Sequence, residues 1–429
     1  MHQIDTTMST DLRTEKHSEL KKTLEYCLNN SNYYKKIWTE KGIVLDDIHS
    51  IADLQKLPFT TKSDLSTNND DFLCVPKQKV SDFVTTSGTT SDPVTFYLTS
   101  KDLDRLGKNE AFALSVAGGT DEDIYQLTTT IDKRFMAGLA YFLGIREMGS
   151  GIVRVGPGAP YLQWESILRF EPTVLIAIPS FIPKLVDYAI QNQIDYKSSS
   201  IQSVICIGEP IRNEDFSLNA LGQRITDIWD LQLHSTYAST EMGAAFTECE
   251  FGNGGHLNPN LLITEVIGEN DLPVGHGELG EVVISTLGVE GMPVIRYRTG
   301  DLCHLYTNKC NCGRETLRLG PVVGRKNQMI KFKGTTVFPP AIFDVLEMNE
   351  RVDLYQVVIS KNEYNNDEIT VVLNDILDSS AFKSKLSSLF KSKLRVTPNF
   401  DFIPVDELQK RIFREDKRKP EKLIYNTKY

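Results

Sequence analysis

Between Phe83 and about Thr286 the chain alternates short apolar, β-branched runs with stretches whose composition suits helices. The clearest runs are residues 151–155, 174–178 and 203–207, and each is followed by glycine or proline and then by a helix-compatible segment. This order is typical of βαβ units, in which helices cover a parallel sheet. The sequence therefore predicts a layered α/β body for this part of the chain.

The hydrophobic patterns on the two sides of this body differ from the βαβ pattern. Residues 11–40 place apolar and aromatic side chains at helical spacing, and from Gly277 onward strands with tight turns are expected, including 280–285 and 292–297. After Gly324 follows a segment of about a hundred residues, an ordinary size for a small domain, with strand-like runs and helical stretches. A length of 429 residues suits two domains. We predict a large domain over 1–325 and a small α+β domain over 326–429.

Charge and hydropathy exclude several classes of partner. The chain has 47 basic and 57 acidic residues, a net charge of −10, and its basic residues are dispersed except at 417–419, which argues against duplex nucleic acid. The most apolar stretch, 174–186, is interrupted by Pro179 and Pro183 and carries Lys184, so no membrane partner is expected. No signal-peptide pattern stands at the start, which predicts a cytoplasmic protein. The sequence leaves a homodimer open.

A hydroxyl-rich loop lies between two strand-like runs. Its residues 85–93 read Thr-Thr-Ser-Gly-Thr-Thr-Ser-Asp-Pro, and hydroxyls around a glycine with inward-turning amides suit phosphate oxygens. The loop lacks the spaced Gly-Lys-Ser/Thr of a Walker loop. A plain polar hairpin is the alternative interpretation.

Two later segments place single carboxylates at turns. In 237–243 a small-residue turn presents Glu241, which suits Mg²⁺ beside phosphates, although a surface acid is equally compatible. In 296–301 Asp301 follows glycine at the end of a strand-like run, where an aspartate accepts bonds from ribose hydroxyls or caps a turn. The letters at 275–280 match a dinucleotide fingerprint, but a strand follows them, so we expect only a turn there.

The order of these segments resembles that of adenylate-forming enzymes. The loop, 237–241, 297–301, 324–331 and a C-terminal lysine occur in that family's succession, while 54–65 and Ile207-Gly208-Glu209-Pro210 are similar to the phenylacetate-CoA ligase family within it. The resemblance runs from about residue 18 to the end. It implies an α/β fold of the adenylate-forming type, with a large layered α/β N-terminal domain that binds nucleotide and acid, and a small, mobile α+β C-terminal domain.

The resemblance also implies an activity with its cofactors. Magnesium-bound ATP and a carboxylic acid would give an acyl-adenylate, and the thiol of coenzyme A would then displace AMP, so ATP/AMP, Mg²⁺ and coenzyme A are the expected ligands. We expect an acid-CoA ligase for an aryl or arylacetic acid, whose apolar pocket is bordered by 135–161 and 179–181. The alternatives are an adenylating enzyme with another acceptor and a nucleotide-binding regulatory protein that has lost catalysis.

The family roles carry over to particular residues. Phosphates would be held by Thr86, Ser87, Gly88, Thr89 and Thr90, with Thr89 counted as catalytic. Adenine would lie against Gly208, Glu209, Pro210 and Tyr237, followed by Ala238, Ser239 and Thr240 in the same nucleotide-binding group. Asp301 and Arg325 would hold ribose, Glu241 would hold Mg²⁺ as a catalytic group, and Asn327 would be the hinge.

Two departures from the family pattern concern charge. Asp92 stands where relatives have a lysine, which places an anion beside the triphosphate unless its side chain points away. The C-terminal motif around 419–424 is degenerate, so Lys419 is our expected catalytic lysine and Lys422 the second choice. A solvated basic tail is the simpler interpretation.

Four residues have the composition of a structural zinc site. Cys249 and His256 flank a glycine-rich stretch, and Cys310 and Cys312 bracket one residue before Gly313, which together give a Cys₃His set. Cys303 and His304 are alternative ligands, although neighbouring positions on a strand point to opposite faces. Reduced cysteines without metal are the other alternative. With four protein ligands the ion would hold loops together and take no part in catalysis.

Overall fold

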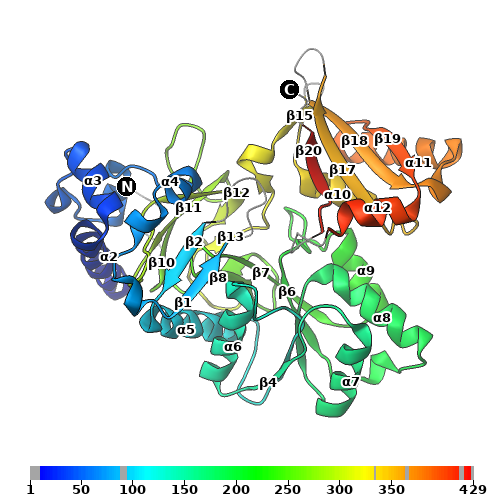
Figure 1. Ribbon diagram of the computed structural model, residues 1–429, viewed down its shortest axis with the longest axis horizontal. Helices are drawn as coiled ribbons and strands as arrows, with labels where there is room; N and C mark the ends of the chain where they lie inside the picture. Colours follow the sequence, from blue (N-terminus) through cyan, green and yellow to red (C-terminus); the bar gives the residue numbers. More distant parts are fainter. Residues whose placement is uncertain (1–9, 87–93, 333–334, 363–366, 415–419, 427–429) are drawn as a thin grey trace. The chain divides into compact units, whose positions relative to one another are not determined.

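The computed structural model describes residues 10–86, 94–332, 335–362, 367–414 and 420–426. The chain divides into two compact units (Figure 1). Residues 1–218 and 222–322 form the first unit, and residues 219–221 and 323–429 form the second.

A parallel sheet with helices between its strands forms the middle of the first unit. Its strands lie in the order β4-β3-β5-β6-β7. Their bounds are β3 (Ile124–Leu127), β4 (Gly151–Arg154), β5 (Val174–Ala177), β6 (Ser203–Ile207) and β7 (Gln232–Ser239). The alternating helical elements are α5 (Ser100–Val116), α6 (Met136–Met148), α7 (Pro160–Phe170), η5 (Pro179–Phe181), α8 (Ile182–Gln191), η6 (Tyr196–Ser198) and α9 (Ala220–Ile228). Every residue of β5 is buried, as expected where helices cover both faces of a parallel sheet, and the predicted βαβ order is confirmed.

Antiparallel strands continue this sheet beyond β7. They follow in the order β8-β9-β13-β12-β11-β10. Their bounds are β8 (Ala244–Glu248), β9 (Gly255–His256), β10 (Leu262–Ile267), β11 (Leu279–Thr286), β12 (Tyr297–Tyr306) and β13 (Arg318–Leu319). The residues 275–280 form a turn that leads into β11, as predicted, whereas the strand expected over 292–297 is wrong because β12 begins only at Tyr297. The backbone of Arg296 has φ +48°, which does not fit a regular strand.

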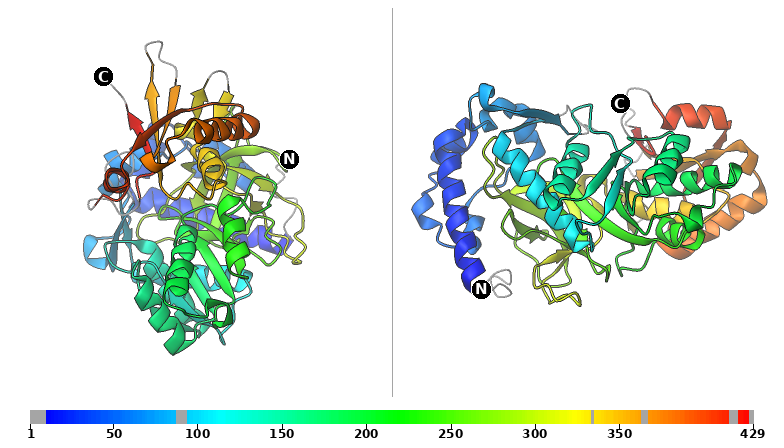
Figure 2. Two further views of the ribbon diagram at one scale, coloured as in Figure 1. Left: turned by 90° about the vertical axis from the view of Figure 1, so that its right-hand side faces the viewer. Right: turned by 90° about the horizontal axis from the view of Figure 1, so that it is seen from below.

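Helices and a hairpin from the N-terminal region complete the first unit. The helical elements are α2 (Thr10–Asn30), α3 (Asn32–Glu40), η1 (Leu45–Asp47), η2 (Ile51–Lys56), α4 (Lys62–Thr67), η3 (Asn69–Phe72) and η4 (Lys77–Lys79). The hairpin pairs β1 (Asp82–Thr85) with β2 (Thr95–Leu98). Leu24, Trp38 and Leu57 join one apolar core with residues of β10 to β12. Figure 2 shows α2 and α3 together at one edge of this unit.

The second unit is a small α+β body, as predicted. A mixed sheet has the strand order β19-β18-β17-β20, and β15 pairs with β16 beside it. The strands are β14 (Gly324–Arg325), β15 (Ile330–Phe332), β16 (Thr335–Val337), β17 (Tyr355–Lys361), β18 (Asp367–Asn374), β19 (Asn399–Ile403) and β20 (Leu423–Asn426). The helical elements are η7 (Lys326–Gln328), α10 (Pro339–Glu347), η8 (Asp375–Leu377), α11 (Ser380–Leu394) and α12 (Val405–Ile412).

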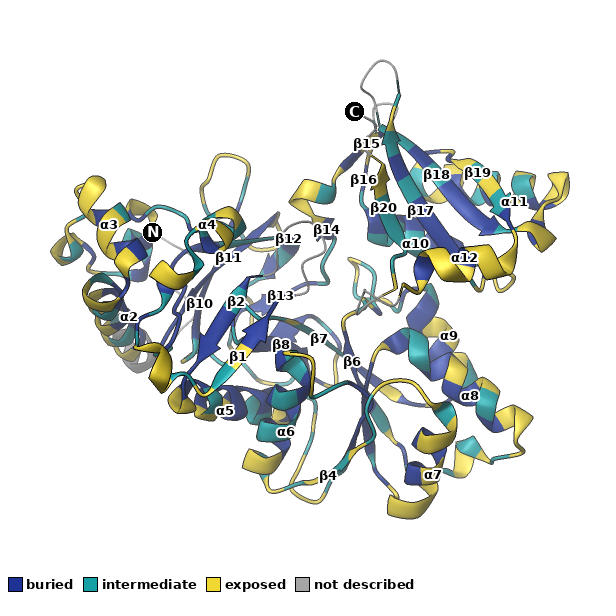
Figure 3. Cartoon of the chain, viewed as in Figure 1, coloured by how far each residue is buried: buried dark blue, intermediate teal, exposed yellow. Residues whose placement is uncertain are grey.

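Each unit buries its own apolar core. In the second unit Ile342, Val357, Val371 and Leu386 belong to one buried cluster. Figure 3 shows the sheet strands of both units as mostly buried, with exposed residues on the outer faces of the helices. No helix within the described residues has the length and apolar character needed to cross a bilayer.

Candidate nucleotide-binding site and metal centre

Tyr237 and Asp301 meet at the carboxyl end of the parallel strands. The hydroxyl of Tyr237, on β7, donates a hydrogen bond to Oδ2 of Asp301, on β12, over 2.8 Å. The amide of Asp301 donates to the hydroxyl oxygen of Thr299 over 3.1 Å, and Asp301 is 7% exposed. Burial, helped by the charge of Asp301, raises the pKa of Tyr237, so its hydroxyl stays protonated as a donor. Tyr237 and Asp301 are 64 positions apart and were predicted to bind adenine and ribose, and they thus lie in contact.

Glu241 lies in the turn after β7, beside a small cavity. The hydroxyl of Tyr297 donates to Oε1 of Glu241 over 3.4 Å, and the amide of Met242 donates to Oγ of Ser239 over 3.3 Å. The cavity has a volume of about 30 Å³, and Thr240 and Glu241 are among its lining residues. That volume suits a water molecule or a small ion. The turn therefore presents a carboxylate oriented by one neighbour and space beside it.

Arg105, which belongs to no recognisable sequence motif, binds the backbone of this turn. Its guanidinium donates to the carbonyl oxygens of Gly243, Leu261 and Leu287 at 2.9, 2.6 and 2.9 Å. Burial lowers the pKa of Arg105 to about 10, a value that still leaves it charged at neutral pH. A buried arginine satisfied by carbonyls alone positions backbone, and here it holds the residues that follow Glu241. Its only sequence signal was an arginine next to Leu106 on the inward face of a helix.

The predicted adenine-side turn follows β6. Gly208 has φ +76°, a conformation that favours glycine, so the chain turns sharply at the end of the strand. The carboxylate of Glu209 accepts hydrogen bonds from the amide and the hydroxyl of Ser180, at 2.9 and 3.0 Å. Glu209 therefore ties the turns after β5 and β6 together.

Residues 57–60, part of the segment 54–65 that resembles the ligase family, support the strand that carries Asp301. Thr60 exchanges backbone hydrogen bonds with both neighbours of Tyr297, since its amide donates to Arg296 and its carbonyl accepts from Arg298. The ring of Phe59 lies 4.0 Å from the guanidinium carbon of Arg296 and 4.5 Å from that of Arg298. These contacts join residues that are more than 230 positions apart, so no local sequence pattern predicts them.

Other predicted residues lie at the hairpin of β1 and β2, in the second unit, or outside the described residues. Thr86 closes the β1–β2 hairpin, with its amide bonded to the carbonyl of Val94 and its hydroxyl to the amide of Val94. Ser87, Gly88, Thr89, Thr90 and Asp92 lie outside the described residues, as does Lys419. Arg325 and Asn327 are exposed residues of the second unit.

Lys422, the second choice for the catalytic lysine, has partners within the second unit. Its ammonium group lies 3.3 Å from Oε1 of Glu347 and 3.3 Å from the hydroxyl of Tyr355. It also lies 4.8 Å from the centre of the Tyr355 ring. These contacts give Lys422 a structural role in joining β20 to β17 and α10.

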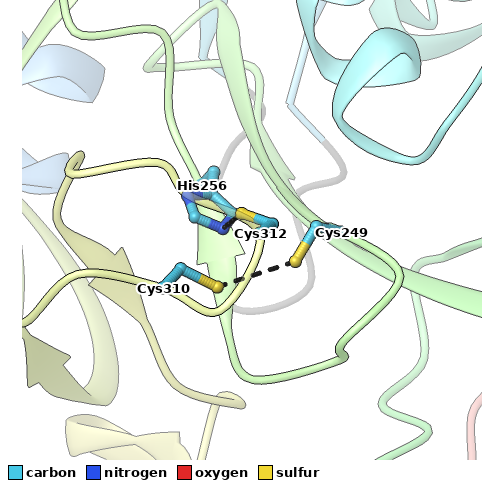
Figure 4. Close-up of side chains that lie close together, drawn as sticks. All are labelled: Cys249, His256, Cys310 and Cys312. Atoms are coloured by element: carbon cyan, nitrogen blue, oxygen red, sulfur yellow. Dashed lines mark hydrogen bonds between the residues drawn. The ribbon is translucent and has the colours of Figure 1, made fainter.

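Cys249, His256, Cys310 and Cys312 lie together, and their ligand atoms are all within 4.8 Å of one another (Figure 4). Sγ of Cys249 is 3.8 Å from Sγ of Cys310, and Sγ of Cys312 is 3.5 Å from Nε2 of His256. Cys249 directly follows β8 and His256 is on β9, while the other two lie in the turn between β12 and β13. The alternative ligands are elsewhere, because Cys303 is fully buried in the apolar core and His304 contacts Glu214.

His256 and Cys312 have the protonation that suits metal ligands, whereas burial raises the pKa of Cys249 to about 12. Burial, with Arg318 and Arg314 nearby, lowers the pKa of His256 to about 4, so the ring is neutral. Its Nδ1 lies 3.0 Å from the hydroxyl of Thr316, which leaves Nε2 facing the sulfurs. Burial by itself would raise the pKa of Cys312, but hydrogen bonds from Arg314 bring it below its usual value. A neutral imidazole held by an outer hydrogen bond and a thiol near an arginine are typical of metal ligands.

Comparison with known proteins identifies the class of protein. The family model described as AMP-binding enzyme matches residues 37–291, more than half of the chain, so the protein belongs to the AMP-binding enzyme family. It is 28% identical to a phenylacetate-coenzyme A ligase of Thermus thermophilus over 84% of this chain and 80% of the relative. It is 27% identical to the phenylacetate-coenzyme A ligase of Escherichia coli over 83% of this chain and 81% of the relative. The predicted resemblance is therefore confirmed.

The fold is confirmed by solved structures. A 2-hydroxyisobutyryl-CoA ligase, in a complex described as the postadenylation state, matches with a TM-score of 0.83 and 20% identity, over 98% of this chain and 91% of that one. An O-succinylbenzoate coenzyme A synthetase of Bacillus subtilis, solved with ATP and magnesium, matches with a TM-score of 0.57 and 17% identity. The match covers 75% of this chain and 66% of that one. The chain has the adenylate-forming enzyme fold.

Proposed function

We propose that the protein is an ATP-dependent acid-CoA ligase that activates an aryl or arylacetic acid as its acyl-adenylate and transfers the acyl group to coenzyme A. The observation that carries the proposal is the convergence of Tyr237, Asp301 and Glu241 at one end of the sheet. These are the residue types that hold adenine, ribose and Mg²⁺ in the family to which the chain belongs. The phenylacetate-coenzyme A ligases among its relatives support the acid and the acceptor.

The residues of the first unit bind and orient the nucleotide in this proposal. Asp301, held in place by the hydrogen bond from Tyr237, accepts hydrogen bonds from the ribose hydroxyls, and the turn at Gly208 borders the adenine. Glu241 would hold Mg²⁺, which when bound offsets the charge of the phosphates. Thr86 to Thr90 would contact the phosphates. Lys419 of the second unit would stabilise the negative charge that develops as the acid attacks.

A panel of carboxylic acids scored by AMP formation tests this function. Aryl and arylacetic acids should give AMP and pyrophosphate from ATP, and coenzyme A should raise turnover by releasing AMP. Formation of AMP that coenzyme A does not accelerate would point to a different acceptor. The absence of pyrophosphate exchange with every acid would instead indicate a nucleotide-binding protein without this chemistry.

We also propose that Cys249, His256, Cys310 and Cys312 bind one structural zinc ion. Thiolates at about 2.3 Å from a tetrahedral zinc lie about 3.8 Å apart, and a nitrogen ligand lies slightly closer to each sulfur. The distances of 3.8 Å between Cys249 and Cys310 and 3.5 Å between Cys312 and His256 fit this geometry. Four protein ligands fill the coordination sphere, so the ion would fasten β8 and β9 to the turn after β12. Metal analysis of the purified protein should find about one zinc per chain.

The cytoplasm supplies both ATP and coenzyme A, and we propose that the protein acts there. Cell fractionation followed by assay of the acid-dependent AMP formation tests this location.

A further inference from the structure

Arg296 has a backbone conformation that residues with a side chain rarely adopt. Its φ is +48°, in the left-handed region. Its guanidinium donates to both carboxylate oxygens of Glu265, each over 3.0 Å, and to the carbonyl oxygen of Leu57 over 2.7 Å. Its amide donates to the hydroxyl of Ser285 over 2.8 Å. Strained residues persist where several contacts hold them, and they gather at functional sites, so we examined what the segment around Arg296 positions.

A closed ring of hydrogen bonds holds Ile295, the residue before Arg296. The amide of Ile295 donates to the hydroxyl oxygen of Tyr34 over 2.8 Å, and the hydroxyl of Thr60 donates to the carbonyl oxygen of Ile295 over 2.7 Å. The two hydroxyl oxygens are 3.2 Å apart. Because the proton of Thr60 is directed to Ile295, Tyr34 is the donor between the two hydroxyls. Tyr34 and Thr60 are 2% and 1% exposed, so this hydrogen-bonded ring is buried.

The backbone of Thr60 extends the contact to the two residues that flank Tyr297. Its amide donates to the carbonyl oxygen of Arg296 over 3.0 Å, and its carbonyl oxygen accepts from the amide of Arg298 over 2.9 Å. These two bonds form an isolated parallel bridge between Thr60 and Tyr297. The helix α4, which begins at Lys62, contacts β12 (Figure 1). Thr60 therefore holds the backbone from Ile295 to Arg298.

Tyr297 connects this segment to the carboxylate of Glu241. Its hydroxyl donates to Oε1 of Glu241 over 3.4 Å, beside the small cavity in that turn. Side chains alternate in a regular strand, but the left-handed conformation of Arg296 interrupts this alternation immediately before Tyr297. The direction of the Tyr297 side chain therefore depends on the contacts that hold its neighbours. At 3.4 Å the bond is close to the limit of hydrogen bonding, so a small displacement of Tyr297 would break it.

We propose that Tyr34 and Thr60 are positioning residues for the Mg²⁺ site, because their hydrogen-bonded ring keeps the segment 295–298 in the conformation that directs Tyr297 to Glu241. The inference rests on the proposed function, in which Glu241 holds Mg²⁺. Both residues act through Tyr297, since neither lines the cavity beside Glu241. Without the ring, the polar backbone groups of Ile295 lose their buried partners and the strained segment relaxes. Groups that orient a metal ligand from outside the coordination sphere tune metal affinity, so binding of Mg²⁺ should weaken.

Mg²⁺ titrations of the thermal transition test this inference without relying on catalysis. The Tm of the full chain is measured with excess ATP at rising Mg²⁺, and each variant is compared with its own Tm in ATP and EDTA. Thr60→Val keeps the shape of the side chain and removes the hydroxyl, so it should raise the half-saturating Mg²⁺ concentration by about 3- to 10-fold. Tyr34→Phe should have the same effect. Thr60→Ser retains a hydroxyl and should restore the wild-type value.

Tyr26→Phe is the matched control. The hydroxyl of Tyr26, on α2, donates to the carbonyl oxygen of Glu290 over 2.8 Å, so it also joins an N-terminal helix to the segment before β12. This variant should lower the Tm of the free protein and leave the half-saturating Mg²⁺ concentration unchanged. If Thr60→Val fails to fold, Tyr34→Phe provides the same comparison with the control.

A double variant tests the route through Tyr297. If Thr60 acts through that tyrosine, Thr60→Val combined with Tyr297→Phe should need no more Mg²⁺ than Tyr297→Phe alone. Independent, additive effects of the two substitutions would overturn the inference.

The same titrations separate this inference from the proposed function. Equal half-saturating Mg²⁺ in the wild type, Thr60→Val and Tyr34→Phe, with a higher value in Glu241→Gln, would overturn the inference and leave the role of Glu241 intact. A wild-type Tm that does not respond to Mg²⁺ would overturn both. A higher Mg²⁺ requirement in Thr60→Val and Tyr34→Phe but not in Tyr26→Phe supports the inference even if no acid yields AMP, an outcome that would refute only the ligase activity.

Discussion

Glu241 has one oriented carboxylate oxygen, 3.4 Å from the hydroxyl of Tyr297, and a cavity beside it. If this carboxylate holds Mg²⁺, Glu241→Gln keeps the shape of the side chain and removes the charge that binds the cation. We expect adenylation to slow by about 10²-fold or more, with little change in the free energy of unfolding. Acid-dependent exchange between ATP and pyrophosphate, followed over a range of Mg²⁺ concentrations, measures this. Exchange unchanged at limiting Mg²⁺ would remove Glu241 from the metal site.

Glu110 makes stability depend on pH. Burial raises its pKa from 4.5 to about 7 and the bond from Asn109 offsets only part of this, while Tyr141 is the titratable neighbour from α6. The folded protein therefore binds more protons than the unfolded chain between pH 4.5 and 7, so stability falls as pH rises through that window. The loss is on the order of 3 kcal/mol and ends above the folded pKa. Urea unfolding at pH 5 and pH 8 should show it in the wild type and much less in Glu110→Gln, and parallel curves would contradict the assignment.

At the scale of elements, the proposed zinc ion would hold the turn between β12 and β13 against β8 and β9. Cys310→Ser should abolish zinc binding and lower the Tm by about 5 °C or more, because binding energy of the ion is folding energy. Substrate KM values should change little. Cys74→Ser, at a buried cysteine away from the cluster, is the control for replacing a thiol by a hydroxyl. Protein that contains no zinc and is fully active would refute the site.

The strands of the parallel sheet were predictable because burial on both faces leaves short, continuous apolar runs, as in β5. The irregular segment before β12 was not. Its apolar letters suit a strand, but Arg296 pairs with the buried Glu265, with 3% and 6% of the two side chains exposed. The carbonyl oxygen of Arg296 accepts from the amide of Thr60, and its amide donates to the hydroxyl of Ser285. Such partners are set by the tertiary fold, which overrides local propensity.

The candidate site was predictable only in part, and for a related reason. Short motifs and the family resemblance predicted Tyr237, Glu241 and Asp301. The expected position of Asp301 at the end of a strand is wrong, because Asp301 lies inside β12. Arg105, the buried side chain that positions the turn after Glu241, lies within a helix whose sequence shows only a polar residue on an inward face. The role of this side chain depends on carbonyl groups that are distant from it in the chain.

At the scale of the whole molecule, we expect the second unit to supply Lys419 for formation of the acyl-adenylate and not for formation of the thioester. Lys419→Ala should slow formation of the acyl-adenylate by roughly 10²-fold or more, because one charge opposite the developing anion is lost. Thioester formation from supplied acyl-adenylate should continue near the original rate. Lys422→Ala should lose its contacts with Glu347 and Tyr355, lower the Tm slightly and leave adenylation intact. The reverse result for the two lysines would identify Lys422 as the catalytic residue.

The central claim is that this chain joins a carboxylic acid to coenzyme A through an acyl-adenylate. Quantifying all products of one reaction, with ATP, Mg²⁺, coenzyme A and phenylacetate, tests it most directly. The account predicts AMP, pyrophosphate and the acyl-CoA thioester in equal amounts, with acyl-adenylate accumulating on the protein when coenzyme A is left out. Formation of ADP in place of AMP, or AMP without any thioester across the whole acid panel, would contradict it.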